Sequence, residues 1–387
     1  MKRQLALMIA VCAGAALAHI GTSAMPFQIG ALMDGTGRTA AQAGAFGFVE
    51  VGALSLAMIL VSARADKLPT RLLALAGGVL TTAANIGLYL ASSLPIQLLF
   101  GLGAGFGYGT IFAATVTAAA ATEIPDRIYA IGNGGALLLI VAFMAAIPFG
   151  TAHLGALGVF GSLAVLVTLC SPLLLGLRRA QLPVLTHLSA WRTPGAAGLL
   201  FSWMAVSLGT TALYAFLERI GRSIHLSPAD IAWTLSSGVF VGVAGTGAAA
   251  ALAGRINRRH ALIVGMTGSG LSCLILGFAT DLFWFATGIF VYWIFYMFLY
   301  SYLLGTAAVL DPSGRVGTLG GGLERLGYAL GAAAGGVLAE HASYSSTGIL
   351  GFAGCALGLA FGFPSLFRAL RVRPGGIKGL QASEAGR

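Results

Sequence analysis

The sequence predicts an all-α integral membrane protein, and composition carries most of that prediction. Of its 387 residues, 57% are hydrophobic and 9% are charged, whereas soluble domains carry about 25% charged residues. Long stretches contain no Asp, Glu, Lys or Arg, and a membrane-spanning helix needs about 20 apolar residues. Because hydrocarbon offers the backbone no partners, the spans must be helices or closed barrels, and the short alternating pattern of barrel strands is absent.

Twelve transmembrane helices account for the apolar stretches. The two longest charge-free stretches, 72–122 and 128–177, each hold two helices, which separate near 92–96 and 150–155. The remaining apolar stretches hold one helix each. In chain order we expect helices at 5–33, 42–64, 72–92, 95–121, 128–150, 154–177, 195–220, 228–253, 261–279, 282–309, 315–339 and 346–367.

The N-terminal segment begins like a secretory signal, with Lys2 and Arg3 before an apolar stretch and an Ala-Leu-Ala sequence at 16–18. The apolar stretch continues to Leu32, which is longer than a signal core, and eleven further predicted spans follow. We therefore expect residues 5–33 to be retained as the first helix.

The net charge of +10 follows the membrane topology and does not indicate a nucleic-acid partner. With the N-terminus inside, 18 of the 22 basic residues fall in cytoplasmic tails and connections, which is the bias of the positive-inside rule. We therefore predict that both termini are cytoplasmic. The absence of Asn-x-Ser/Thr acceptors and the excess of Arg over Lys favour a bacterial inner membrane.

The longest polar connection between spans divides the chain into two sets of six helices. The predicted units are an N-terminal bundle at 1–177, a cytoplasmic loop at 178–194, a C-terminal bundle at 195–372 and a cytoplasmic tail at 373–387. Two halves related by a parallel repeat are typical of transporters whose substrate site lies between the halves.

Two decapeptides at equivalent places in the halves carry a family resemblance. "SARADKLPTR" (62–71) follows the second helix, and "AALAGRINRR" (250–259) follows the eighth helix 188 residues later. Both resemble the G-x-L-A-D-R-x-G-R-R signature of the major facilitator superfamily. The matching positions are Ala65, Asp66 and Arg71, with a conservative Lys67, in the first copy and Leu252, Ala253, Arg255, Arg258 and Arg259 in the second.

The resemblance implies the fold of this superfamily, two pseudo-symmetric six-helix bundles with a substrate site near the midplane. It also implies a gating role for Asp66, because the acidic residue of this loop binds neighbouring helices in the superfamily and holds the outward-facing state. The gating candidates of the two copies are Asp66, Lys67, Arg71, Arg255, Arg258 and Arg259. The alternative is that these charges only enforce topology.

The fourth helix departs from one pattern of the superfamily. Many of its proton-coupled exporters carry an arginine four residues before a glycine-rich stretch, and "QLLFGLGAGFGYG" (97–109) has the glycines without the arginine. This difference disfavours a drug exporter. Gly101, Gly105 and Gly109 fall on one helical face, where small residues let another helix approach closely.

The main candidate site lies in the eleventh helix, within "LGGGLERLGYALGAAAGG" (319–336). A charge at the bilayer centre costs about 2.5–3.5 kcal/mol, so a charge kept there indicates function. Glu324 lies about 14 Å along the helix from Arg315, and Arg325 is turned about 100° from Glu324, so we expect one of the two to face a neighbouring helix. Arg325 suits an anionic group, because its planar fork matches carboxylates, and Glu324 suits a proton. A structural ion pair with another helix is the alternative.

His19 and Glu50 are candidates for proton coupling. Counted from the outer ends of their predicted helices, His19 lies about 21 Å and Glu50 about 12 Å along the helix axis, and imidazole and carboxylate groups can both exchange protons inside a membrane. A hydrogen-bonded packing pair is the alternative.

Further candidates are aromatic or polar side chains of predicted spans. Tyr292, Trp293 and Tyr296 lie mid-span in the tenth helix, either as packing aromatics or as a wall for a ring-bearing substrate. Asn133 in the fifth helix is placed to bind substrate or to bond across helices. Tyr214 and Glu218, four residues apart at the outer end of the seventh helix, form a gate or a solvated helix end.

Together these features predict a secondary active transporter of a small organic solute, with an organic anion as a class that fits Arg325. We expect proton coupling, a monomer in the lipid bilayer, and no cofactor or metal, because no nucleotide-binding loop or Cys/His metal spacing is present. We do not expect an enzyme, because no nucleophile–base pair lies in the spans. The alternatives are a proton-driven exporter of amphipathic or drug-like compounds and a non-transporting membrane sensor on the same fold.

Overall fold

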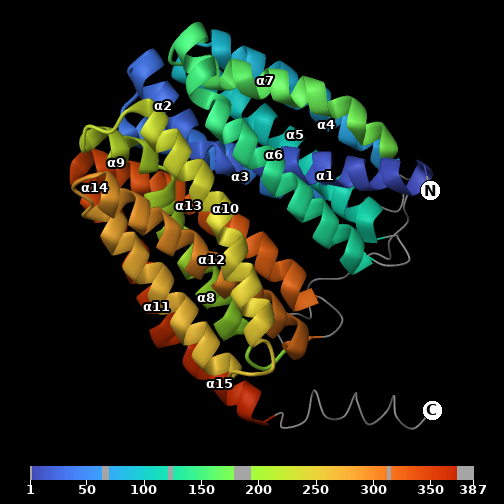
Figure 1. Ribbon diagram of the computed structural model, residues 1–387, viewed down its shortest axis with the longest axis vertical. Helices are drawn as coiled ribbons and strands as arrows, with labels where there is room; N and C mark the ends of the chain where they lie inside the picture. Colours follow the sequence, from blue (N-terminus) through green and yellow to red (C-terminus); the bar gives the residue numbers. More distant parts are fainter. Residues whose placement is uncertain (1, 63–68, 121–124, 178–192, 312–314, 373–387) are drawn as a thin grey trace.

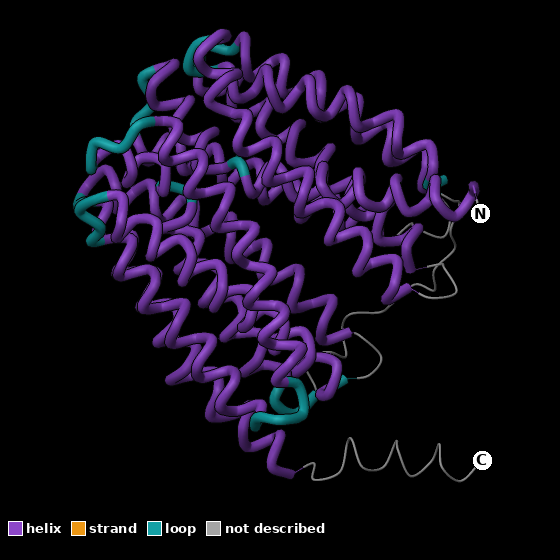
Figure 2. The backbone as a smooth tube through the Cα atoms, in the orientation of Figure 1, coloured by secondary structure: helices purple, strands orange, loops and turns teal. Residues whose placement is uncertain are grey.

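The computed structural model describes residues 2–62, 69–120, 125–177, 193–311 and 315–372. Within these ranges the chain forms helices with short connections and no strand (Figure 2). Eleven of the described helices are long and apolar enough to cross a membrane. A further long helix, α13 (Arg315–His341), is less apolar because it carries Glu324 and Arg325 among many glycines.

The other elements follow in chain order. The N-terminal half contains α1 (Lys2–Ser23), α2 (Met25–Thr36), α3 (Ala40–Ser62), α4 (Thr70–Leu90), α5 (Leu94–Ala120), α6 (Pro125–Leu154), α7 (Gly158–Cys170) and the 3₁₀ helix η1 (Ser171–Gly176). The C-terminal half contains α8 (Ala196–Tyr214), α9 (Leu217–Ser223), α10 (Pro228–Leu252), α11 (Arg258–Gly277), α12 (Leu282–Leu310), α13, α14 (Tyr344–Leu357), the π-helical segment η3 (Gly358–Gly362) and α15 (Phe363–Val372).

The two halves repeat the same arrangement. α4 begins at Thr70 and α11 begins at Arg258, 188 residues later, and the same interval separates Leu94 of α5 from Leu282 of α12. α4 and α7 lie on one flank of the molecule, and α11 and α14 lie on the opposite flank (Figure 1). The prediction of an all-α membrane protein with two pseudo-symmetric bundles is therefore confirmed.

The prediction of one continuous helix was wrong for two of the spans, because each of them is broken into two helices. The predicted helix at 5–33 consists of α1 and α2, which meet at Ala24, and Pro26 lies in the first turn of α2. Proline has no N–H and clashes with the carbonyl four residues earlier, which disfavours an unbroken helix at this point. The predicted helix at 195–220 consists of α8 and α9, which are separated by Ala215 and Phe216.

The second break contains no proline and lies at a contact with the other half. Ala215 and Phe216 are fully buried. The hydroxyl of Tyr214 donates to the carbonyl of Ser23 at 2.9 Å, which gives a partner to a carbonyl at the end of α1. The two breaks therefore meet, one from each half.

Glycines allow α3 and α5 to pack at backbone distance. A Cβ atom at Gly105 would overlap the carbonyl of Glu50, one at Gly109 would overlap the carbonyl of Leu54, and one at Gly101 would lie 2.7 Å from the ring of Phe46. The predicted close approach at these three glycines is confirmed.

The halves contact each other most closely on one side of the molecule. We call the side where α1 begins and α15 ends the termini side, and the opposite side the far side. The helices of the two halves lie together on the far side and diverge toward the termini side (Figure 1). Residues whose side chains face the boundary between the halves are therefore candidates for a site.

Candidate functional site

Arg325 points from α13 toward the N-terminal half. Its Nη2 atom lies 3.2 Å from Nδ1 of His19 on α1. Its guanidinium carbon lies 5.4 Å from the ring centre of Tyr328 and 6.0 Å from that of Phe112 on α5. Arg325 is 8% exposed, and within the described ranges no carboxylate oxygen lies within 4.0 Å of its nitrogens. A buried guanidinium is thus held by a ring nitrogen and two aromatic rings without a direct ion pair.

This contact determines the protonation state and the tautomer of His19. A guanidinium carries only donors, so Nδ1 must accept and the imidazole is neutral, with its proton on Nε2. The ring of His19 packs edge-on against Phe112, with ring centres 5.2 Å apart. A second proton on the imidazole would remove the acceptor and place two cations side by side.

Glu324 faces α12 within its own half. The hydroxyl of Tyr296 donates to Oε1 of Glu324 at 3.2 Å, and the hydroxyls of Tyr296 and Tyr328 lie 2.5 Å apart. Tyr300 also lies close enough to interact with the carboxylate. Glu324 and Arg325, adjacent in sequence, are therefore turned to different neighbours: Glu324 to the tyrosines of α12, and Arg325 to the other half.

The tyrosines of α12 form a parallel stack. The rings of Tyr292 and Tyr296 are 5.6 Å apart with planes at 5°, and Tyr300 and Tyr214 extend the stack at its two ends. Trp293 meets Tyr292 edge-on, with planes at 90°. Each ring of the stack has a parallel ring beside it, so Tyr292 and Tyr296 offer hydroxyls and edges more readily than free faces.

Glu50 lies apart from the Arg325 cluster. Its Oε1 accepts a hydrogen bond from Nε2 of Gln28 at 3.2 Å, and its Oε2 has no hydrogen-bond partner within the described chain. Glu50 is 2% exposed. Within the described ranges no hydrogen bond joins Glu50 to His19, so the two proton candidates do not form the hydrogen-bonded pair that the sequence left open.

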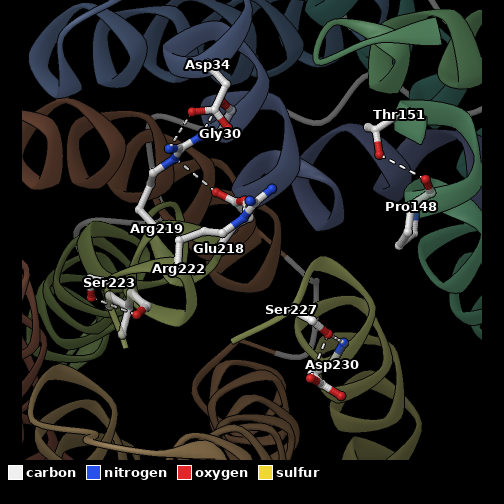
Figure 3. Close-up of polar contacts among 11 residues, drawn as sticks. Gly30, Asp34, Pro148, Thr151, Glu218, Arg219, Arg222, Ser223, Ser227 and Asp230 are labelled. Carbon is white, nitrogen blue, oxygen red and sulfur yellow. Dashed lines mark hydrogen bonds and ion pairs between the residues drawn. The ribbon is translucent and has the colours of Figure 1, made fainter. Parts of the chain in front are cut away.

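A charged network joins the halves on the far side (Figure 3). Two nitrogens of Arg219 on α9 contact both carboxylate oxygens of Asp34 on α2, at 2.7 and 2.8 Å. Glu218 contacts Nε of Arg219 at 3.0 Å and Nε of Arg222 at 2.9 Å. Because the chain breaks after Tyr214, Glu218 does not continue the helical stripe that the four-residue spacing predicts. Glu218 instead forms ion pairs with Arg219 and Arg222 on α9.

A glycine seam also joins the halves. A Cβ atom at Gly44 of α3 would lie 2.5 Å from the carbonyl of Ala332 and 3.0 Å from Cα of Gly336 on α13. At the end of this seam the amide of Ala41 donates to Oε2 of Glu340 at 2.8 Å. We call Gly44, Ala332 and Gly336 the far-side seam.

The signature residues divide between described and undescribed parts of the chain. Asp66 and Lys67 lie outside the described residues, and so does the side chain of Asn133. Nε of Arg71 donates to the carbonyl of Leu177 at 3.3 Å, within the N-terminal half.

The basic residues of the second signature copy contact their own half. Arg258 donates to the carbonyl of Gly305, and the guanidinium of Arg259 lies 5.1 Å from the ring centre of Phe367. Arg255 is exposed. The gating role of these residues stays a prediction.

Four residues of the site were missed by sequence reasoning. Tyr328 follows Glu324 by one helical turn, so its spacing was a usable signal. Phe112, Asp34 and Gln28 meet Arg325, Arg219 and Glu50 through tertiary packing. No sequence spacing indicates those pairings.

No protein-family model matches the sequence, and a search of curated proteins returned no match. Solved structures do match. The nucleoside transporter NupG has a TM-score of 0.73 at 14% identity, covering 96% of this chain and 99% of that one. A bacterial homologue of the human lysosomal transporter Spinster, in an inward-facing and unoccupied conformation, has a TM-score of 0.72 at 15% identity, covering 96% and 98%. The peptide transporter POT has a TM-score of 0.72 at 15% identity, covering 95% and 94%. The chain therefore has the fold of the major facilitator superfamily.

Proposed function

We propose that this membrane protein is a proton-coupled secondary active transporter of a small organic anion. The observation that carries the proposal is the guanidinium of Arg325, which lies between the halves with His19 as its polar partner and no carboxylate within 4.0 Å in the described chain. A charge at this depth is costly and indicates function. The structures it resembles are named as a nucleoside transporter, a bacterial homologue of a lysosomal transporter and a peptide transporter, which supports transport without indicating the substrate.

Access from the termini side is consistent with binding at Arg325. Apart from the nearby residues of α13 itself, no heavy atom lies within 4 Å of a Cβ placed at Gly321 or Gly322, which precede Arg325 on this helix. On the far side, the contact between Arg219 and Asp34 and the far-side seam hold the halves together. With the termini in the cytoplasm, this arrangement is the inward-facing state.

The pair of Arg325 and His19 supplies a mechanism for coupling. A carboxylate can accept two parallel bonds from a guanidinium. When His19 takes up a proton, it stops accepting from Arg325 and becomes a second cation, and a carboxylate between the two groups would satisfy both. Anion and proton then bind together, so loading leaves the net charge of the site unchanged, and the two halves close around it.

Other groups take supporting roles in this proposal. Glu50, buried without a cationic partner, is the second candidate for the coupled proton. Glu324 and Tyr296 position α13 against α12 through their hydrogen bond, so that Arg325 stays turned toward the other half. Tyr292 stacks on Tyr296 and meets Trp293 edge-on, and Asn133 is a further candidate for binding the substrate.

The gates and the moving units follow from the same fold. We propose Arg219, Glu218 and Tyr214 as parts of the far-side gate, and Asp66, Lys67, Arg71, Arg255, Arg258 and Arg259 as parts of the gate on the termini side. The units that rock are 1–177 and 195–372, joined by a cytoplasmic loop at 178–194 and followed by a tail at 373–387. The protein acts as a monomer in a bacterial inner membrane, with both termini in the cytoplasm.

Uptake into proteoliposomes tests this function. Aromatic and aliphatic carboxylates, amines and neutral ring compounds are first screened by thermal shift of the purified protein, and the strongest ligand is then used in radiolabelled form. We expect a carboxylate, with accumulation driven by an imposed pH gradient and abolished by a protonophore. A sensor would bind a ligand without moving it. An exporter of amphipathic compounds would instead select hydrophobic amines.

A further inference from the structure

A second candidate site lies on the outside of the C-terminal half, away from Arg325. A groove of about 450 Å³ lies on the termini side between the start of α11 and the segment η3–α15. Ile263, Leu359, Phe363 and Phe367 contribute its apolar lining, and Arg259 and Arg368 contribute two guanidinium groups. This pairing of apolar wall and basic side chains is not explained by transport between the halves.

The groove faces lipid. α11 and α14 form an outer flank of the molecule (Figure 1). Large apolar side chains beside the groove are exposed, with Phe361 at 70%, Val264 at 51% and Leu357 at 46%. A transmembrane protein presents such side chains to acyl chains, so an occupant of the groove comes from the bilayer.

Both arginines are positioned by one contact each and keep other donors free. The guanidinium of Arg259 lies 5.1 Å from the ring centre of Phe367, and Nε of Arg368 donates to the carbonyl of Pro364 at 3.3 Å. Within the described ranges no carboxylate oxygen lies within 4.0 Å of either guanidinium. Arg259 also lies in the first turn of α11, whose N-cap is Asn257. The positive end of that helix dipole adds to the two charges.

A helical irregularity shapes the groove. η3 is a π-helical segment of five residues between α14 and α15. Such segments are rare and frequently occur at functional sites. Leu359 lies within η3 and Phe363 follows it directly, so the irregular turn sets the position of the wall that faces Ile263.

We propose that this groove binds an anionic phospholipid, whose phosphate contacts Arg259 and Arg368 and whose acyl chain lies along Ile263, Leu359 and Phe363. Charge complementarity selects the headgroup, because guanidinium groups form strong hydrogen bonds with phosphate. Basic pockets between transmembrane helices bind such headgroups. The proposal depends on the membrane location of the chain and not on its transport activity.

Lipid binding to the full-length protein in detergent tests the proposal. Dioleoyl phosphatidylglycerol or dioleoyl phosphatidylcholine is titrated, and bound lipids are counted by native mass spectrometry. We expect phosphatidylglycerol to bind at least tenfold more tightly. The double variant Arg259→Gln/Arg368→Gln weakens its binding about thirtyfold, which corresponds to about 1 kcal/mol for each basic side chain near a membrane surface.

Three further variants separate a built site from general attraction. Arg255→Gln removes an exposed charge that does not line the groove and leaves the affinity unchanged. Leu359→Trp fills the groove without changing charge and lowers the affinity as much as the double variant does. The double variant Arg259→Lys/Arg368→Lys keeps both charges and retains most of the binding of the unaltered protein. It replaces the glutamine variant in the experiment if that variant does not fold. Equal affinity for the two lipids, or tight binding of phosphatidylglycerol to the Leu359→Trp variant, overturns the proposal.

Discussion

The guanidinium of Arg325 on α13 donates to Nδ1 of His19 on α1 over 3.2 Å, across the boundary between the two halves of the molecule. The two residues are 306 positions apart in the chain. Because the donor belongs to one half and the acceptor to the other, any group that replaces this hydrogen bond changes how the halves hold together. A ligand bound at this point would therefore be linked to the relative position of the bundles.

Replacing Arg325 tests the anion site. Arg325→Ala removes the guanidinium and should abolish binding of the carboxylate found in the screen, while the protein still folds. Arg325→Lys keeps the charge and loses the fork, so the affinity should fall about ten- to hundredfold, since a hydrogen bond to a charged group contributes about 1.5–3 kcal/mol. Thermal shift and gel filtration measure binding and folding in the same samples. If Arg325→Ala prevents stable insertion, the arginine is a structural partner; if it transports normally, the anion site lies elsewhere.

Replacing His19 and Glu50 identifies the proton carrier. Glu50→Gln keeps the hydrogen bond to Gln28 and removes the titratable group. If Glu50 carries the proton, transport driven by a pH gradient should stop while exchange of labelled for unlabelled substrate continues. His19→Ala should have the same effect if His19 carries the proton. Counterflow and gradient-driven uptake are compared in the same proteoliposomes. Unchanged gradient-driven uptake in both variants would show that neither residue couples transport to protons.

Reversing the pair of Asp34 and Arg219 tests the far-side gate. Asp34→Arg alone places two cations together and should shift the population toward the state open on the far side about fivefold, since a partly exposed pair contributes about 1 kcal/mol. The double variant Asp34→Arg/Arg219→Asp should restore the original population. Spin labels at Thr39 and Ser223, in a background without native cysteines, report the distance across the gate. No recovery in the double variant would indicate that the pair does not hold the gate.

Two glycines of α13 provide a matched test of the far-side seam. A Cβ at Gly336 would lie 2.5 Å from the carbonyl of Ala40, whereas a Cβ at Gly322 meets no heavy atom within 4 Å. Both Gly→Ala changes raise helix propensity by about 0.5–1 kcal/mol. We expect Gly336→Ala to lengthen the distance between labels at Thr39 and Ser223, and Gly322→Ala to leave it unchanged. Equal effects of the two variants would mean that backbone contact at the seam does not control closure.

Topology is tested by reporter fusion. The 18 of 22 basic residues on the predicted inner side predict that both termini and the 178–194 connection lie in the cytoplasm. A reporter that is active only in the cytoplasm should work when fused after Arg387 or inserted in that connection. Activity of a reporter that works only in the periplasm would reverse the assignment of both membrane sides.

Much of the fold follows from the sequence alone. Hydrocarbon forces every spanning segment to satisfy its own backbone, so long apolar stretches are enough to predict helices and their approximate ends. The 188-residue repeat predicts that α4 and α11 occupy equivalent places, and the structure agrees. Pro26 was a readable signal for the break between α1 and α2, whereas the break after Tyr214 has no proline and lies where Tyr214 contacts Ser23 of the other half.

The site shows where local sequence stops being informative. The sequence alone indicates that Glu324 and Arg325 lie deep in the membrane and that a turn of about 100° separates them. It does not indicate which neighbour each side chain meets, because that depends on how α13 is rotated against α12, α3 and α8. Tertiary packing turned Arg325 toward His19 and Glu324 toward Tyr296. Hydrophobic periodicity specifies helices and their depth, whereas pairs hundreds of residues apart are decided by the close packing of glycine-rich backbones and side chains in three dimensions.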